Sequence, residues 1–105
     1  MDIIDLKADR KDVLENMYSW FSDEVDKRIM RVNLCLKNKI VIDFEDISLC
    51  SYSDSLRVPL EMFLRKMEEL ENMGMKVEQY KFFNHPINKW TIDWENLIGD
   101  GNESI

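Results

Sequence analysis

Apolar side chains recur at helical spacing in the first third of the chain. Over residues 9–28 they follow one another at intervals of three or four, which predicts an amphipathic helix. Asp9 is a suitable N-cap, and Lys27 and Arg28 lie at the other end, where the helix dipole favours cations. Trp20 lies beside the apolar stripe, so it either covers an edge of the core or faces a partner. The stripe consists of Leu14, Met17, Tyr18, Phe21 and Val25.

The pattern then changes to alternation. Residues 29–36 place Val32, Leu34 and Leu36 on one side, and residues 40–44 form a β-branched apolar run. The short polar break between these two segments predicts a β-hairpin. Because the second segment is apolar on both faces, it is expected to be a central strand that is covered on each side.

A second helix is expected after a serine-rich corner at residues 51–55. The corner offers several N-cap residue types, and Pro59 suits only a first turn, so the helix should begin between residues 55 and 58. The apolar spacing continues to Met73, and Gly74 is the expected C-cap. Residues 75–83 predict a further strand, and residues 84–86 a turn. Residues 89–94 are either a last strand or the lead-in to a helical turn at 95–98.

These elements predict an α+β fold with an α/β-like core in the order α-β-β-α-β-β. Two helices would pack on a small mixed sheet, in which the strands on either side of the second helix form a parallel pair. The length of 105 residues fits one domain. We expect a globular domain over residues 1–98 and a flexible C-terminal tail over 99–105.

The chain is acidic, and this narrows the classes of partner. Its net charge is −7 and its pI is near 4.7, so it should repel nucleic acid and anionic membranes and attract a protein with a basic surface. No signal-peptide pattern or long apolar run is present, which favours the cytoplasm. Cys35 and Cys50 fit no metal-binding spacing and are expected to be buried thiols.

Catalytic motifs are missing from the sequence. There is no nucleophile elbow and no glycine-rich phosphate loop, so neither an enzyme nor a cofactor is expected. One alternative is a small metal-dependent enzyme that uses Asp43, Asp46 and His85. The competing interpretation is that the two carboxylates lie at a solvent-exposed strand end and that the single histidine, beside a turn, is a surface residue. Another alternative is a structural subunit or homodimer that pairs through an exposed sheet edge or helix face.

Aromatic and acidic side chains remain as candidates for partner binding. Tryptophan is enriched at interface hot spots, and carboxylates would steer a basic partner. Trp90 and Trp94 are either such anchors or residues that close the bottom of a small core. The hypothesis is a protein that inhibits or regulates its partner by occlusion, as an immunity protein, a phage-type anti-defence inhibitor or a regulatory antagonist does. The candidate contact residues are Trp20, Glu68, Glu69, Trp90, Asp93, Trp94 and Glu95.

Two segments, IVIDFEDISLCSYSDS and NMGMKVE, resemble parts of a STAS domain, the fold of bacterial anti-sigma-factor antagonists. The resemblance spans residues 39–82 and implies a protein-binding switch, with a phosphorylated serine aligned near Ser51 or Ser53. The chain departs from the family pattern because it has no glycine at this corner and begins with a long helix. The other interpretation of the corner is a helix cap, in which the hydroxyls bond to backbone N–H groups.

Overall fold

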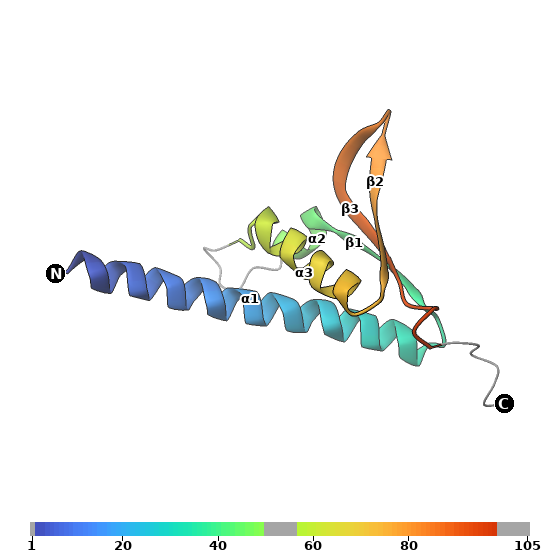
Figure 1. Cartoon of the computed structure of the whole chain (residues 1–105), viewed down its shortest axis with the longest axis horizontal. Helices are drawn as coiled ribbons and strands as arrows, with labels where there is room; N and C mark the ends of the chain where they lie inside the picture. Colours follow the sequence, from blue (N-terminus) through green and yellow to red (C-terminus); the bar gives the residue numbers. More distant parts are fainter. Residues whose placement is uncertain (1, 50–56, 99–105) are drawn as a thin grey trace.

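The computed structural model describes residues 2–49 and 57–98. In chain order the elements are α1 (Ile3–Leu34), β1 (Lys39–Asp43), α2 (Phe44–Leu49), α3 (Leu60–Asn72), β2 (Lys76–Phe82) and β3 (His85–Asp93). Helix α1 runs along the length of the molecule, α3 lies beside it, and the hairpin of β2 and β3 projects away from both (Figure 1). The predicted α+β class and the single domain are confirmed, and the predicted C-terminal tail lies outside the described residues.

Helix α1 is longer than predicted at both ends. Its N-cap is Asp2, whose side chain accepts a hydrogen bond of 3.0 Å from the Ile4 N–H, so the predicted start at Asp9 was wrong. The predicted strand over 29–36 was also wrong, because most of this segment is the last part of α1. Ile29 and Val32 continue the buried stripe at helical spacing and pack on the core, whereas Leu34 is 82% exposed.

The three strands form one antiparallel sheet in the order β1-β3-β2. Strands β1 and β2 run in the same direction, but β3 lies between them, so the predicted parallel pair and mixed sheet were wrong. The predicted hairpin of 29–36 with β1 does not form, because β1 pairs with β3 instead. For residues 89–94 two alternatives were predicted, a last strand or the lead-in to a helical turn. The strand is observed, and it begins earlier than predicted, at His85.

A short helix that was not predicted follows β1 directly. The Asp43 side chain accepts a hydrogen bond of 3.0 Å from the Glu45 N–H, and this bond begins the turn of α2. Ile47 on α2 is buried in the core. The observed order is therefore α-β-α-α-β-β, with α2 in the place of the loop that was expected after the strand.

Phe63 on α3 lies at the centre of the core. Its ring contacts Phe21 of α1 at a centroid distance of 4.5 Å, Phe44 of α2 at 4.9 Å and Trp90 of β3 at 5.8 Å. The same side chain is fully buried. Three helices and the sheet thus meet on one aromatic cluster, which fixes where β3 leaves the core.

Lys66 is the one charged side chain that is buried among the described residues. Its Nζ lies 2.8 Å from the Asp26 Oδ1 and donates a hydrogen bond of 2.7 Å to the Ser22 Oγ. Both partners belong to α1, so the pair joins α3 to α1. A buried ammonium group is tolerated only with such partners, and the pair therefore sets the relative position of the two helices.

Helix α3 ends in a Schellman motif around Gly74. Gly74 has φ +101° and donates its N–H to the Glu71 carbonyl at 2.9 Å, and the Met75 N–H bonds to the Leu70 carbonyl at 3.0 Å. The predicted glycine cap is confirmed. The predicted start of this helix was too early, because Pro59 occupies the N-cap position and Leu60 is the first helical residue.

We predict that Gly74→Ala lowers the free energy of unfolding by about 1–2 kcal/mol, because the positive φ is strained for a residue with a Cβ. The new Cβ would also lie 2.8 Å from the Leu97 Cδ2. Urea denaturation measures the effect, and Gly74→Asn, which tolerates positive φ better, should lose less. Equal stability of wild type and Gly74→Ala would contradict this account of the corner.

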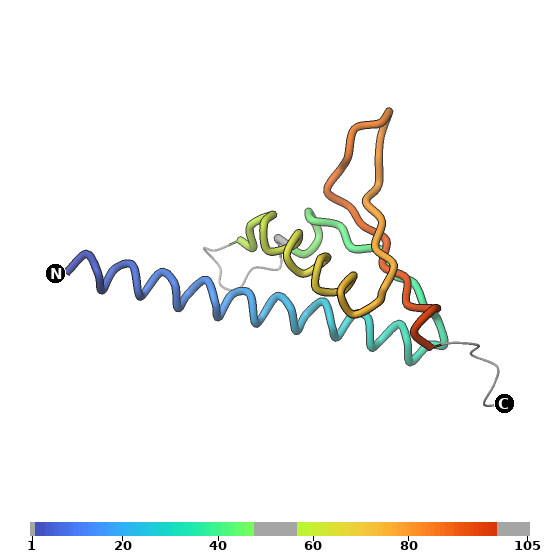
Figure 2. Tube along the Cα trace, in the orientation of Figure 1, coloured from blue at the N-terminus to red at the C-terminus, as the bar shows by residue number. Residues whose placement is uncertain are grey.

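Two parts of the molecule extend beyond the core, as the trace in Figure 2 shows. The principal extents are 62 × 37 × 25 Å, which is elongated for a chain of this length. One extension is the N-terminal half of α1, and the other is the far end of the β2–β3 hairpin. Among the described residues, neither extension contributes a buried side chain to the core beyond the point where it leaves it.

Candidate interaction surface

The far end of the β2–β3 hairpin closes in a two-residue turn without glycine. Phe82 pairs with His85, and Phe83 and Asn84 between them have φ values of +50° and +66°. Two successive positive φ values are typical of a type I′ turn, which favours asparagine and glycine. The predicted turn over residues 84–86 was displaced, because His85 and Pro86 belong to β3.

The turn exposes two phenylalanines. Phe83 is 81% exposed and Phe82 is 64% exposed, and their rings meet edge to face at a centroid distance of 4.5 Å. A left-handed conformation is costly for a bulky residue such as Phe83, by roughly 1–2 kcal/mol. Tyr80 and Ile87 are the next exposed apolar side chains along the two strands. We call Tyr80, Phe82, Phe83 and Ile87 the aromatic tip.

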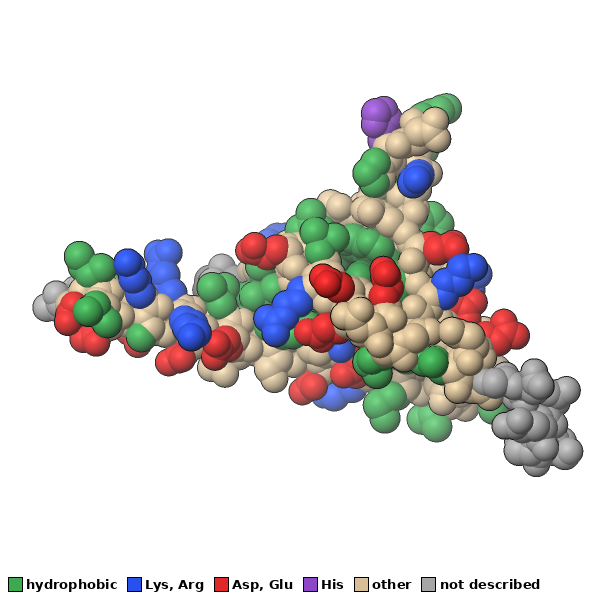
Figure 3. Space-filling view, viewed as in Figure 1, with side chains coloured by type: hydrophobic (Ala, Val, Ile, Leu, Met, Phe, Trp, Pro, Cys, Tyr) green, Lys and Arg blue, Asp and Glu red, His purple; other side chains and the backbone are tan. Residues whose placement is uncertain are grey.

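The arm that carries the aromatic tip differs in charge from the rest of the chain. Residues 79–92 contain Lys81, Lys89 and His85 but no aspartate or glutamate, whereas the whole chain has a net charge of −7. Lys89 lies with its Nζ 5.2 Å from the centroid of the Tyr80 ring. In the space-filling view the upper arm shows apolar, basic and histidine side chains, and the acidic side chains lie lower down (Figure 3).

An irregularity in the strand pairing separates the aromatic tip from the core. The register of β2 and β3 shifts between Gln79 and Lys81, where β3 has extra residues. The Gln79 side chain donates a hydrogen bond of 2.8 Å to the Ile87 carbonyl within this stretch. This bond gives a partner to a backbone oxygen at the shift and so supports the arm beyond it.

A cleft of about 330 Å³ lies at the base of the arm, between α3 and the hairpin. Its walls combine apolar side chains with two carboxylates, those of Glu68 and Glu71. Leu64, which also lines the cleft, is 49% exposed. The cleft lies at the base of the hairpin arm and the aromatic tip at its far end, and we call the two together the hairpin surface.

The three tryptophans belong to the core. Trp90 and Trp94 are each 3% exposed, so of the two interpretations offered by the sequence, closing the core is the one observed. The Trp94 Nε1–H donates a hydrogen bond of 3.0 Å to the Asn33 Oδ1, which ties the end of β3 to α1. Trp20 is half-buried and packs against the core edge. At this exposure neither Trp90 nor Trp94 protrudes as an anchor, although Trp90 forms part of the wall of the cleft, and a contact of these residues with a partner stays a prediction.

Of the acidic residues predicted to contact a partner, two make interactions within the chain and two lie at the surface. The Asp93 carboxylate accepts hydrogen bonds from the Glu95 N–H at 2.9 Å and the Asn38 Nδ2 at 3.0 Å, and these bonds, the first above all, lower its pKa. Glu69 lies 3.4 Å from the Arg65 Nε on α3. Glu95 is exposed beside Asp93, and Glu68 alone of the predicted acidic residues lines the cleft.

The residues named for the alternative of a metal-dependent enzyme do not come together within the described residues. Asp43 pairs with Lys89 in the sheet, which places His85 four residues further along β3, or about 13 Å away. Residues 2–49 and 57–98 contain no group of three or more potential metal-binding side chains. Ser51 and Ser53 lie outside the described residues, as does Cys50. Cys35, which was expected to be buried, is exposed.

Sequence reasoning missed the aromatic tip, although a signal was present. Consecutive residues of a strand point to opposite faces, so Phe82 and Phe83 cannot both enter one core. The tip was overlooked because residues 75–83 were predicted only as a strand, without a turn at their end. An aromatic pair followed by asparagine is compatible with a strand end and a turn.

No family model, curated protein or solved structure matches this chain. Helix α1 is long, but within the part of the chain that the structure describes no helix has the length and apolar content to cross a membrane.

Proposed function

We propose that this chain is a cytoplasmic protein-binding module that inhibits or regulates its partner by occlusion. In this proposal the aromatic tip enters an apolar pocket of the partner and blocks it. The observation that carries the proposal is Phe83, which is 81% exposed in a conformation that is costly for its side chain. Strain of this kind persists where the surrounding structure enforces it, and it is concentrated at binding sites.

The chemistry of the hairpin surface supports a protein as the partner. Exposed phenylalanines at a protruding turn offer a large apolar area with few rotatable bonds, which suits a hot spot that fills a pocket. At the base of the arm, Glu68 and Glu71 would receive a basic side chain of the partner. The lysines of the arm, Lys81 and Lys89, favour carboxylates around the pocket that takes the tip.

The net negative charge of the chain would favour the approach of a basic partner. A net charge of −7 attracts a partner with a basic surface and repels nucleic acid, so the tip is not expected to stack on bases. The partner would therefore combine a basic surface, facing α3, with an apolar pocket that has acidic groups at its rim. The resemblance to a STAS domain stays a prediction, and it too implies a role in binding a protein.

The proposal is tested by capture from a lysate of the source organism with three immobilised forms of the chain. These are the wild type, the tip variant F82S/F83S, and the control L34S/L36S, which removes similarly exposed leucines beside the C-terminal end of α1. We expect one protein to be retained by the wild type and by the control but not by the tip variant. Purified, that protein should bind the wild type at least about 30-fold tighter than the tip variant.

Two outcomes of the same experiment would overturn the proposal. The first is retention of the same protein by wild type and tip variant. The second is binding of the wild type, but not of the tip variant, to vesicles that contain phosphatidylserine, with no protein captured. That result would make the aromatic tip a membrane-inserting element. Circular dichroism of all three forms checks that the substitutions leave the fold intact.

A further inference from the structure

The N-terminal half of α1 extends past α3, and little of the described part of the chain packs on it. Residues 2–16 are all exposed, among them Ile3 at 68%, Ile4 at 73% and Leu14 at 48%. A helix gains most of its stability from packing its apolar face, and without such packing a segment of this length is marginal in water. The exposed apolar side chains of this half of α1 therefore favour packing against a partner.

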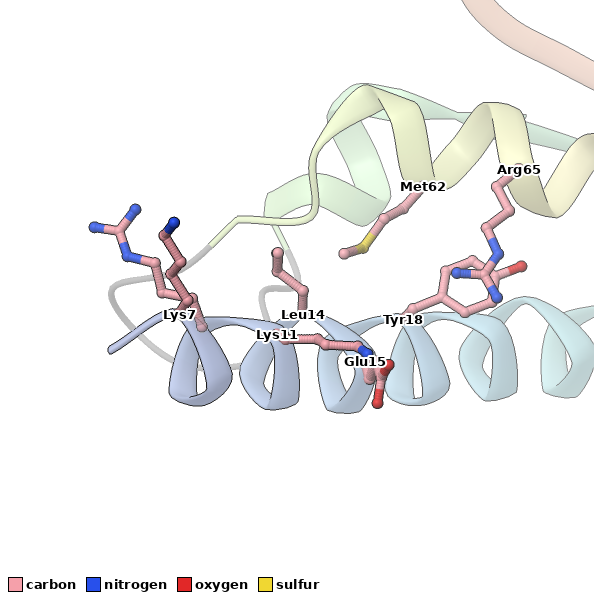
Figure 4. A pocket seen from close by; sticks show the side chains of 8 residues that line it. Lys7, Lys11, Leu14, Glu15, Tyr18, Met62 and Arg65 are labelled. Atoms are coloured by element: carbon pink, nitrogen blue, oxygen red, sulfur yellow. The ribbon is translucent and has the colours of Figure 1, made fainter. Parts of the chain in front are cut away.

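A groove of about 340 Å³ runs where this half of α1 meets the start of α3. Leu14 and Tyr18 from α1 and Met62 from α3 form its apolar lining, as the close view shows (Figure 4). Tyr18 is 8% exposed, and its hydroxyl is buried without a hydrogen-bond partner among the described residues. Burial, together with the nearby Glu69 carboxylate, raises the pKa of this phenol.

Cations dominate the rim of this groove, although the chain as a whole is acidic. Lys7, Arg10 and Lys11 from α1 and Arg65 from α3 line it, against one carboxylate, Glu15. The Arg65 guanidinium lies over the Tyr18 ring, with its Cζ 3.8 Å from the ring centroid. The lining residues carry four cations and one anion, and Glu69, which lies near Tyr18 and pairs with Arg65, adds a second anion, so the groove has a net positive charge on a chain of net charge −7.

The charges decide which occupant fits. A second copy that packed its α1 antiparallel on this face, centred near Arg10, would bring the cationic rows of the two copies together, and like charges in contact are unfavourable. Nucleic acid would pair its phosphates with the rim but would leave the apolar lining without a complement. A helix with one apolar face and acidic flanks matches both the lining and the rim.

We infer that the groove between the N-terminal half of α1 and the start of α3 is a second docking surface, and that it binds an acidic amphipathic helix of a partner protein. The apolar face of that helix would lie on Leu14, Tyr18 and Met62. Its carboxylates would pair with Lys7, Arg10 and Lys11, whereas Arg65 is already paired with Glu69. This inference does not depend on the aromatic tip, which lies at the end of the other extension (Figure 1).

The test uses two synthetic helical peptides of about 18 residues, long enough to form a helix. Both carry leucines on one face, and they differ only in having glutamates or lysines on the flanks. Fluorescence anisotropy should show the acidic peptide binding the full chain at least about tenfold tighter than the basic peptide at low salt, with the preference reduced at high salt. Equal binding of the two peptides, or none of either, would overturn the inference.

Matched variants locate the binding. K7E/K11E should weaken the acidic peptide by about tenfold or more, whereas K37E/K39E, which changes the net charge equally beyond the other end of α1, should not. F82S/F83S should bind the acidic peptide as the wild type does, so failure of this inference and failure of the proposed function are distinguishable. Sedimentation that shows a dimer lost only in K7E/K11E would overturn the inference in favour of a second copy.

Discussion

Trp90→Ala should lower the free energy of unfolding by roughly 3–5 kcal/mol, a large part of the stability of a domain of this size. Trp90 is 3% exposed, stacks on Phe63 at a centroid distance of 5.8 Å and lies opposite Ile42 in the sheet. Truncation to alanine would remove the contacts of the indole and leave a cavity between α3 and the sheet, which the surroundings can fill only in part.

Urea denaturation followed by circular dichroism measures this loss. Trp20→Ala is the matched control, because Trp20 is only half-buried at the core edge, and it should cost about 1–2 kcal/mol. If Trp90→Ala had the stability of the wild type and failed to bind the partner, Trp90 would be an interface residue and the account of the core would be wrong.

Phe83→Asn is expected to make the chain more stable and less able to bind. Phe83 has φ +50°, and asparagine adopts this conformation at lower cost, so the unfolding free energy should rise by about 1 kcal/mol. The substitution also removes a side chain that is 81% exposed. If that side chain is a hot spot, affinity for the partner should fall about 30-fold or more, which corresponds to about 2 kcal/mol.

The opposite signs of these two effects distinguish a binding role from a structural one. A residue that serves the fold loses stability when it is replaced, whereas a strained residue kept for binding gains stability and loses affinity. Thermal unfolding gives the first quantity. A lower melting temperature for Phe83→Asn would contradict the view that the turn is strained by its phenylalanine.

Local chemistry made part of the fold predictable. Gly74 marks the end of α3 because few other residues adopt its φ of +101°. The β-branched run predicted as a strand is found in β1, but the predicted central position was wrong, because β1 lies at an edge of the sheet and Val41 on one of its faces is 44% exposed. The segment 29–36 was misassigned because its alternation competes with a helical spacing through Val25, Ile29 and Val32. Packing against α3 and the sheet decides between the two patterns, and that packing is not local.

Strand order and the candidate surface depended on contacts that lie far apart in the chain. The position of β3 between β1 and β2 follows from the pairing of Ile42 with Trp90 and of Val77 with Ile92, which no local pattern encodes. The same pairing buries Trp90, for which the sequence left both a core role and a partner-binding role open. It leaves Phe82 and Phe83 beyond the core, at the end of an arm, where their exposure becomes evident only once the register is known.

The most direct test of the account compares the partner's dissociation constant for Phe83→Asn with that for Asn84→Gly by isothermal titration calorimetry. Both substitutions relax the same turn, since Asn84 has φ +66°, but only the first removes an aromatic side chain. The account predicts weaker binding by about 30-fold or more for Phe83→Asn and a change within about twofold for Asn84→Gly. Equal affinities for the two variants would show that the aromatic tip is not the contact surface.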